Sequence, residues 1–211
     1  GEWAACTQQA REVRASMRER GTERELARAA IWLGWGILEP HRLGDAVPTG
    51  EWQEAEEALA EATQIYDRSL SPTTAIASRL QWSTLCILQG RLADARRLLA
   101  EANEKASVLH SLGWTGGHLQ WLEALVATAE GDWVGAMDWF DAACKTLEDV
   151  GAHWWWARVL LDWAEAHATR GQPGDRPRAT ELLREAQEAF EDMGVPRYAA
   201  IARERLQELA G

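Results

Sequence analysis

The amino-acid sequence predicts an all-α fold, a right-handed solenoid of about five helix-turn-helix repeats with units of about 40 residues. Three observations lead to this prediction. A pattern of glycine, large apolar residue and alanine returns along the 211 residues. No segment alternates apolar and polar residues as a half-buried strand does, and β-branched residues are sparse. The hydrophobic fraction of 46% is typical of a globular protein with a buried core.

The repeat is defined by its glycines. Each copy has a large apolar residue two positions after the glycine, alanine at five, a large apolar residue at nine and alanine at twelve. Full copies begin at Gly50, Gly90 and Gly131, a weaker copy begins at Gly174, and a partial copy begins at Gly1. Alanines with this spacing lie on one helix face, where they allow a neighbouring helix to approach closely. Each unit is therefore predicted to be two helices that meet at the glycine turn.

Ten helices follow from this pattern, each bounded by a turn glycine or another break. In chain order they are expected over about 2–20, 22–38, 51–70, 72–89, 91–112, 115–130, 132–149, 152–170, 176–193 and 196–210. The breaks that end every second helix are Gly21, Ser71-Pro72, Gly113, Gly151 and Gly194-Val195-Pro196, and both prolines stand where the next helix begins. Two polar, turn-rich insertions, 39–49 and 171–177, are expected as loops.

The whole chain, 1–211, is expected to form one continuous domain. Its repeat units are placed at about 1–21, 22–71, 72–113, 114–150 and 151–194, followed by a capping helix over 196–210. The polar character of that last helix is typical of the end of a solenoid. Because the first unit has only one helix, we expect the sequence to be a segment of a longer protein.

This Gly-x-aromatic-x-x-Ala register resembles the tetratricopeptide repeat across essentially the whole chain, with units longer than the usual ~34 residues. Long, degenerate repeats of this kind resemble the sensor regions of bacterial STAND signal-transduction ATPases, including LuxR-type and maltose-regulon-type activators. The segment from Leu182 through Met193 to Leu206 is particularly similar to them. The resemblance implies a sensor that binds a small molecule or a peptide in a concave groove, with an NTPase domain elsewhere in the same full-length chain. The alternative is a constitutive scaffold that binds a partner protein's peptide or helix.

Composition and motifs argue against several other functions. The net charge of −11 does not suit binding to nucleic acid. The sequence has no phosphate-binding loop, zinc motif or nucleophile elbow, so we expect no catalytic residue, no metal, no cofactor and no enzyme activity. No apolar run is long enough to span a membrane, and no signal peptide opens the chain, so we expect no membrane association and a cytoplasmic location. Cys6, Cys86 and Cys144 are predicted to be small residues at helix interfaces.

The candidate site rests on an unusual aromatic content of 13 Trp against 2 Phe and 2 Tyr. Five tryptophans occupy turn-packing or inter-helix positions of the repeat and are predicted to be core: Trp3, Trp52, Trp82, Trp133 and Trp163. In the tetratricopeptide family, the residues at fixed distances before the turn glycine point into the concave groove. On this resemblance the ligand-binding residues are Arg28, Trp35, Trp114, His118, Trp121, Trp155 (or Trp154), Arg158 and Glu165. Trp gives a flat contact surface and Arg a bidentate fork. For any single Trp, the alternative is that it fills space between helices.

Acidic residues are concentrated between Glu101 and Glu165, where eleven carboxylates accompany three basic side chains. Two interpretations stay open. The stretch is a solvated acidic face, or it is a docking surface for a basic partner.

Overall fold

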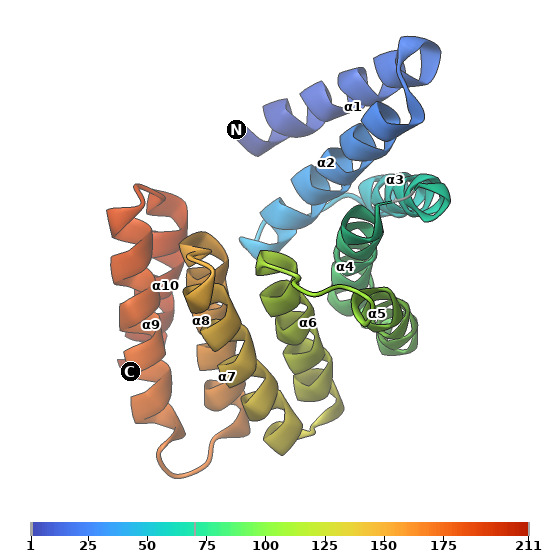
Figure 1. Cartoon of the computed structure of the whole chain (residues 1–211). Coiled ribbons are helices and arrows are strands. Elements are labelled where there is room, and N and C mark those ends of the chain that lie inside the picture. Colours follow the sequence, from blue (N-terminus) through green and yellow to red (C-terminus); the bar gives the residue numbers. More distant parts are fainter. Residues whose placement is uncertain (1, 70, 211) are drawn as a thin grey trace. The chain divides into compact units, whose positions relative to one another are not determined.

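The structure is a computed structural model that describes residues 2–69 and 71–210, with side chains from Ala4 onward. Every regular element in these residues is an α-helix (Figure 1), so the predicted all-α class is confirmed. Consecutive helices pack against each other in pairs, as the helix-pair repeat requires. None of the helices in the described ranges is both long and apolar enough to cross a lipid bilayer.

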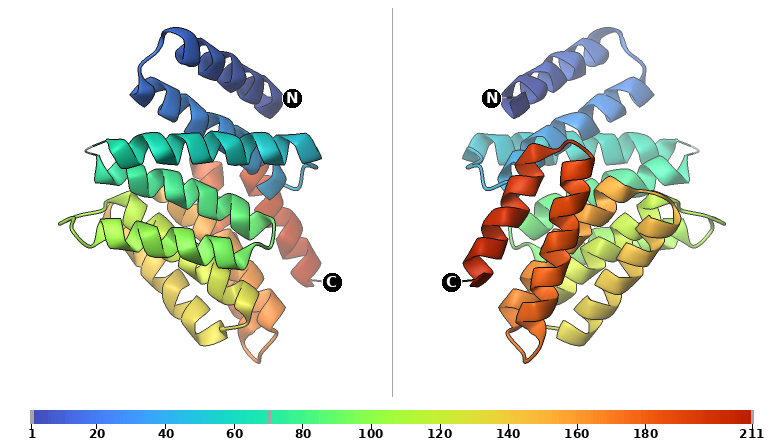
Figure 2. Two further views of the ribbon diagram at one scale, coloured as in Figure 1. Left: turned by 90° about the vertical axis from the view of Figure 1, so that its right-hand side faces the viewer. Right: turned by 90° about the vertical axis from the view of Figure 1, so that its left-hand side faces the viewer.

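Contacts between helices divide the chain into two compact units, Gly1–His110 and Ser111–Gly211. The first contains α1 (Glu2–Arg20), α2 (Glu23–Arg42), α3 (Thr49–Arg68), α4 (Pro72–Leu88) and α5 (Leu92–Ala106). The second contains α6 (Trp114–Glu130), α7 (Trp133–Asp149), α8 (His153–Arg170), α9 (Asp175–Asp192) and α10 (Pro196–Ala210). Within each unit successive helices are adjacent, as in the hairpin of α9 and α10 (Figure 2). The division falls near the end of the predicted repeat unit 72–113, and the single continuous domain stays a prediction.

The repeat alanines lie where the helices approach most closely. All those at positions five and twelve of the four copies are 0% exposed: Ala55, Ala62, Ala95, Ala102, Ala136, Ala143, Ala179 and Ala186. The large apolar residues at position nine are also buried, and these are Leu59, Leu99, Phe140 and Leu183. Burial of each such side chain contributes about 1.5–3 kcal/mol. The pattern that defines the repeat is therefore the pattern of the core.

The boundary of α2 differs from the prediction. The helix continues to Arg42 with Pro40 inside it, although the sequence predicts a loop from residue 39. Proline has no N–H to donate to the carbonyl four residues earlier, which is that of Gly36. The hydroxyl of Thr7 in α1 donates a hydrogen bond to this carbonyl at 3.0 Å and satisfies it. A tertiary contact thus allows the helix to pass through the proline.

Two further predictions need correction. The helix expected over 91–112 ends at Ala106, where the Ser107 hydroxyl donates to the carbonyl of Glu104 at 2.7 Å. Val108, which follows, is 72% exposed, so no buried apolar face supports more helix. Of the cysteines, Cys86 and Cys144 are buried as predicted, whereas Cys6 is exposed.

The tryptophans predicted to be core are buried to different degrees. Trp163 is 9% exposed and stacks on Phe140, with 6.0 Å between ring centroids. Trp52, Trp82 and Trp133 are half-buried. The side chain of Trp3 lies outside the described residues.

Candidate binding site

The candidate site lies in the second unit, where the first turns of α6 and α8 meet. Gly113, just before α6, has a φ of 53°, a conformation that favours glycine. Within the first turn, a Cβ at Gly117 would lie 2.4 Å from Cγ of Leu147 in α7. Glycine therefore allows the start of α6 to lie directly on α7. This close approach fixes the turn that carries Trp114 and His118.

Four aromatic rings from α6 and α8 form a cluster that we term the aromatic stack: Trp114, His118, Trp121 and Trp155. The rings of Trp114 and Trp155 are nearly parallel, with centroids 5.3 Å apart and an interplanar angle of 6°. His118 stacks on Trp155 at 4.6 Å, and Trp121 meets Trp155 edge-on at 6.1 Å. Stacked and edge-on contacts of this kind contribute about 0.5–1.5 kcal/mol each beyond the area they bury. The stack is therefore a preformed surface rather than a loose group of side chains.

Arg158 in α8 is the charged group beside the stack. Its guanidinium carbon lies 5.7 Å from the ring centroid of Trp121, 5.3 Å from that of Trp154 and 4.7 Å from that of Tyr198 in α10. Its Nη1 also donates a hydrogen bond to Oη of Tyr198. Burial lowers the pKa of Arg158 to about 10, and the negative charge of Asp162 opposes this shift. The guanidinium remains charged at neutral pH and interacts with the faces of three rings.

Asp162 fixes the innermost ring. Its Oδ2 accepts a hydrogen bond from Nε1 of Trp121 at 3.1 Å. Trp121 is 0% exposed, so this bond satisfies a donor that water cannot reach. The polar groups around the stack thus hold its rings in fixed orientations.

Only the outer part of the site meets solvent. Trp114 is 40% exposed and Trp155 is half-buried, whereas His118, Trp121 and Arg158 are 1%, 0% and 3% exposed. The sequence offsets predict that the last three face an open groove, and their burial shows that they do not. Neighbouring rings from α8 and α10 cover them. What the arrangement can offer a ligand is the flat, apolar face of Trp114.

The other predicted residues are not members of the stack. Glu165, further along α8, is exposed and pairs with Arg205 at 3.2 Å. Arg28 and Trp35 belong to α2 in the first unit. Arg28 is exposed there, and Trp35 is half-buried with its ring edge-on to Trp32 at 5.2 Å. Their role in ligand binding stays a prediction.

Two residues of the site are absent from the sequence prediction, Asp162 and Tyr198. Each contacts a partner about one repeat away: Trp121 and Asp162 are 41 positions apart, and Arg158 and Tyr198 are 40 apart. Equivalent positions of successive repeats lie next to each other in a solenoid. The repeat spacing is thus the signal that could have found both residues.

Charged groups elsewhere in the second unit form no metal site. Among the described residues, no group of three or more His, Cys, Asp and Glu side chains could hold a metal ion. The acidic stretch includes four exposed carboxylates of α7: Asp138, Asp141, Glu148 and Asp149. These side chains are among those that a basic partner can reach.

Comparison with known proteins supports the fold and no narrower assignment. No protein-family model and no curated protein matches the chain. Among solved structures, the crystal structure of BtubC (BKLC) from P. vanneervenii is similar, with a TM-score of 0.58 and 12% sequence identity. The match covers 99% of this chain and 88% of that one. At this identity the likeness shows a shared helical-repeat fold.

Proposed function

We propose that the chain is a binding module rather than an enzyme, and that its ligand stacks on Trp114. The observation that carries this proposal is the aromatic stack, in which an indole that is 40% exposed rests on the parallel ring of Trp155. A rigid aromatic ring gives a large contact area at a low cost in conformational entropy. The ligand therefore carries a flat apolar face, as oligosaccharides, nucleobases and aromatic peptide side chains do.

The buried members of the site support this surface. Arg158 lies among the rings of Trp121, Trp154 and Tyr198 and is 3% exposed, so it acts as a positioning residue. Trp155 backs the exposed indole of Trp114. A preorganised surface of this kind loses less entropy on binding than one that must be ordered by the ligand.

The sensor of a STAND-type bacterial signalling ATPase is the more specific form of the proposal. In it, ligand binding biases a nucleotide switch in an NTPase domain of the same full-length chain. Its support is the resemblance of the repeats between Leu182 and Leu206 to those regulators. The coding sequence that flanks this segment provides the test. A Gly-x-x-x-x-Gly-Lys-Ser/Thr segment is expected there. A full-length chain without a nucleotide-binding domain refutes the sensor.

A constitutive scaffold is the second candidate, and the exposed carboxylates of α7 favour it. A scaffold of this type binds an extended basic peptide or helix along Asp138, Asp141 and Asp149. Because the contact is between exposed charges, it weakens as salt rises. A discrete ligand on Trp114 is much less sensitive to salt.

Intrinsic tryptophan fluorescence and thermal melting, screened against oligosaccharides, nucleotides and peptides, test the binding module. A ligand that prefers the folded state raises the melting temperature. Trp114→Ala should then weaken its binding about tenfold or more, because a stacked ring contributes about 1–3 kcal/mol. Trp139→Ala is the matched control, since Trp139 is 41% exposed on α7 of the same unit. Equal binding by both variants and the wild type overturns the assignment of Trp114.

A further inference from the structure

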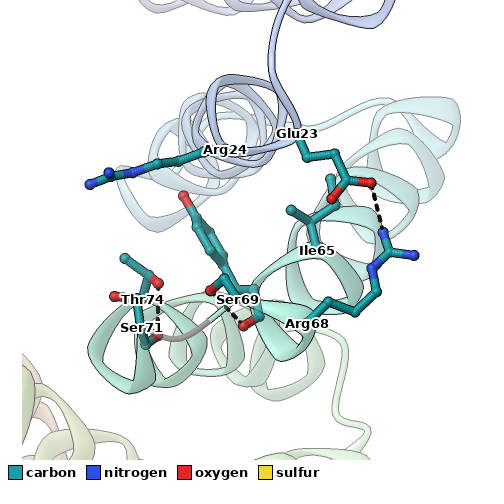
Figure 3. Close-up of a pocket in the computed structure, with 8 residues that line it drawn as sticks. Glu23, Arg24, Ile65, Arg68, Ser69, Ser71 and Thr74 are labelled. Carbon is teal, nitrogen blue, oxygen red and sulfur yellow. Dashed lines mark hydrogen bonds and ion pairs between the residues drawn. The ribbon is translucent and has the colours of Figure 1, made fainter.

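A cavity lies in the first unit, whereas the aromatic stack belongs to the second. It has a volume of about 500 Å³, within the range of small-molecule pockets. Glu23 and Arg24 line it from α2, and the end of α3 and the start of α4 line it from the other side (Figure 3). The residues on that side are Ile65, Tyr66, Arg68, Ser69, Ser71 and Thr74. Seven of the eight lining residues carry a polar or charged group, although apolar atoms make up more of the lining surface.

The phenol of Tyr66 is the unusual member of the lining. The residue is 5% exposed, yet among the described residues its hydroxyl has no hydrogen-bond partner. The oxygen does not belong to the fully buried polar atoms that lack a partner, so it is reached from the cavity, where water or a ligand can complete its hydrogen bonds. Burial raises the pKa of Tyr66, and the positive charges of Arg24 and Arg28 oppose this shift. The phenol therefore stays protonated, and it faces a positive field.

The remaining donors point to an anion. Within the described part of the chain, Arg24 is exposed and forms no ion pair. Ser71, at the start of α4, makes no side-chain hydrogen bond to the first turn, and that turn has no acidic residue. The positive end of the α4 dipole is thus uncompensated.

Other polar groups of the lining are already engaged. The one carboxylate, Glu23, is held by Arg68 at 3.4 Å (Figure 3). The hydroxyls of Ser69 and Thr74 donate to backbone carbonyls at 2.8 and 2.9 Å. Three donors from different elements are left for a ligand: those of Arg24, Tyr66 and Ser71.

We propose that this pocket binds the phosphate group of a small phosphomonoester. A phosphate presents several acceptor oxygens and up to two negative charges, which suits a guanidinium, two hydroxyls and a helix N-terminus. The cavity is larger than a phosphate ion alone requires, so the organic part of the ester occupies the rest of it. This site is independent of the ligand proposed for Trp114.

Isothermal titration calorimetry with inorganic phosphate and with a sugar phosphate tests the proposal, with the free sugar as the negative control. Tyr66→Phe should weaken phosphate binding about tenfold, because one hydrogen bond to a charged group is lost. The variant folds, since it removes only a hydroxyl without a partner, and its melting temperature without phosphate should equal or exceed that of the wild type. Arg24→Gln should weaken binding at least as much.

Arg184→Gln in α9 is the matched charge control, because Arg184 is exposed and lies outside the pocket. It should leave phosphate binding unchanged, as should Trp114→Ala. The absence of binding to the wild type at millimolar phosphate and sugar phosphate overturns the proposal. So does an equal loss in Arg24→Gln and Arg184→Gln, which indicates attraction to net charge only.

Discussion

Replacing Asp175 with Asn should destabilise the protein by about 3 kcal/mol, because this carboxylate closes the connection between α8 and α9. Asp175 is 3% exposed. It accepts hydrogen bonds from Nε of Arg170 at 2.9 Å and from the backbone N–H of Gln172 at 2.8 Å, and Nδ1 of His167 lies 2.7 Å from its Oδ1. A second nitrogen of Arg170 also binds Oδ1.

The magnitude follows from these contacts. Asparagine keeps one acceptor oxygen, and its amide group turns two hydrogens toward donors. About two charge-assisted hydrogen bonds are lost, each worth about 1.5–3 kcal/mol. Arg170 is partly exposed, so water recovers part of this loss. A net loss of about 3 kcal/mol lowers the melting temperature by about 6–12 °C in a chain of this length.

Urea unfolding followed by far-UV circular dichroism measures the change, with Asp192→Asn as the control. Asp192 is an exposed carboxylate at the end of the same helix, and its replacement should cost less than ~0.5 kcal/mol. Equal stability of the two variants would falsify the assigned role of Asp175.

The effect should also depend on pH in a defined direction. Hydrogen bonds from Arg170, His167 and the backbone of Gln172 hold the pKa of Asp175 well below its ordinary value, with the Arg170 bonds contributing most. A depressed folded-state pKa adds stability that is present above the unfolded pKa of about 3.9 and is lost as pH falls through the folded value. The stability difference between the wild type and Asp175→Asn should therefore be full at pH 7 and shrink below about pH 4. A difference that grows in acid contradicts this account.

Two further outcomes are expected from the packing. Gly117→Ala should destabilise the protein by about 1–3 kcal/mol, since its Cβ would overlap a buried leucine of α7. Gly50→Ala is the control and should be neutral or slightly stabilising, because a Cβ there meets nothing within 4 Å. Urea unfolding compares the two variants, and equal stability contradicts the close approach of α6 to α7. A thiol-specific maleimide should label Cys6 rapidly and the other cysteines only after unfolding, because burial raises the pKa of Cys86 to about 11 and that of Cys144 to about 12. Mass spectrometry counts the labels, and rapid labelling at all three positions contradicts the burial.

The repeat was predictable from sequence because its cause is local. Small residues such as Ala95 and Ala102 lie on one helix face, and their spacing alone identifies the buried side. The extent of α2 was not predictable in the same way, because its passage through Pro40 depends on the hydroxyl of Thr7 in another helix. No spacing within α2 reports that contact.

The sequence predicts which residues of the candidate site come together, but not how deeply each of them is buried. The family offsets place Trp114, His118, Trp121 and Arg158 on neighbouring faces, and the structure brings these residues together. The same offsets do not show that α10 supplies Tyr198, whose ring covers the guanidinium. The burial of Arg158 depends on the next repeat, because that repeat contributes the side chain that covers it.

Arginine serves two different purposes in this chain, and its environment distinguishes them. Arg158 is surrounded by rings, and burial lowers its pKa to about 10. Its charge interacts with the rings of Trp121, Trp154 and Tyr198 and helps to orient them. Arg24 lines a cavity together with the Tyr66 hydroxyl, which has no partner in the described residues, so the charge of Arg24 is available to a ligand. A guanidinium that already contacts three aromatic faces gains little from a further anion, because the anion must be desolvated to reach it. Arginine therefore supports the aromatic stack from behind in the second unit, whereas in the first unit it lines the proposed binding site itself.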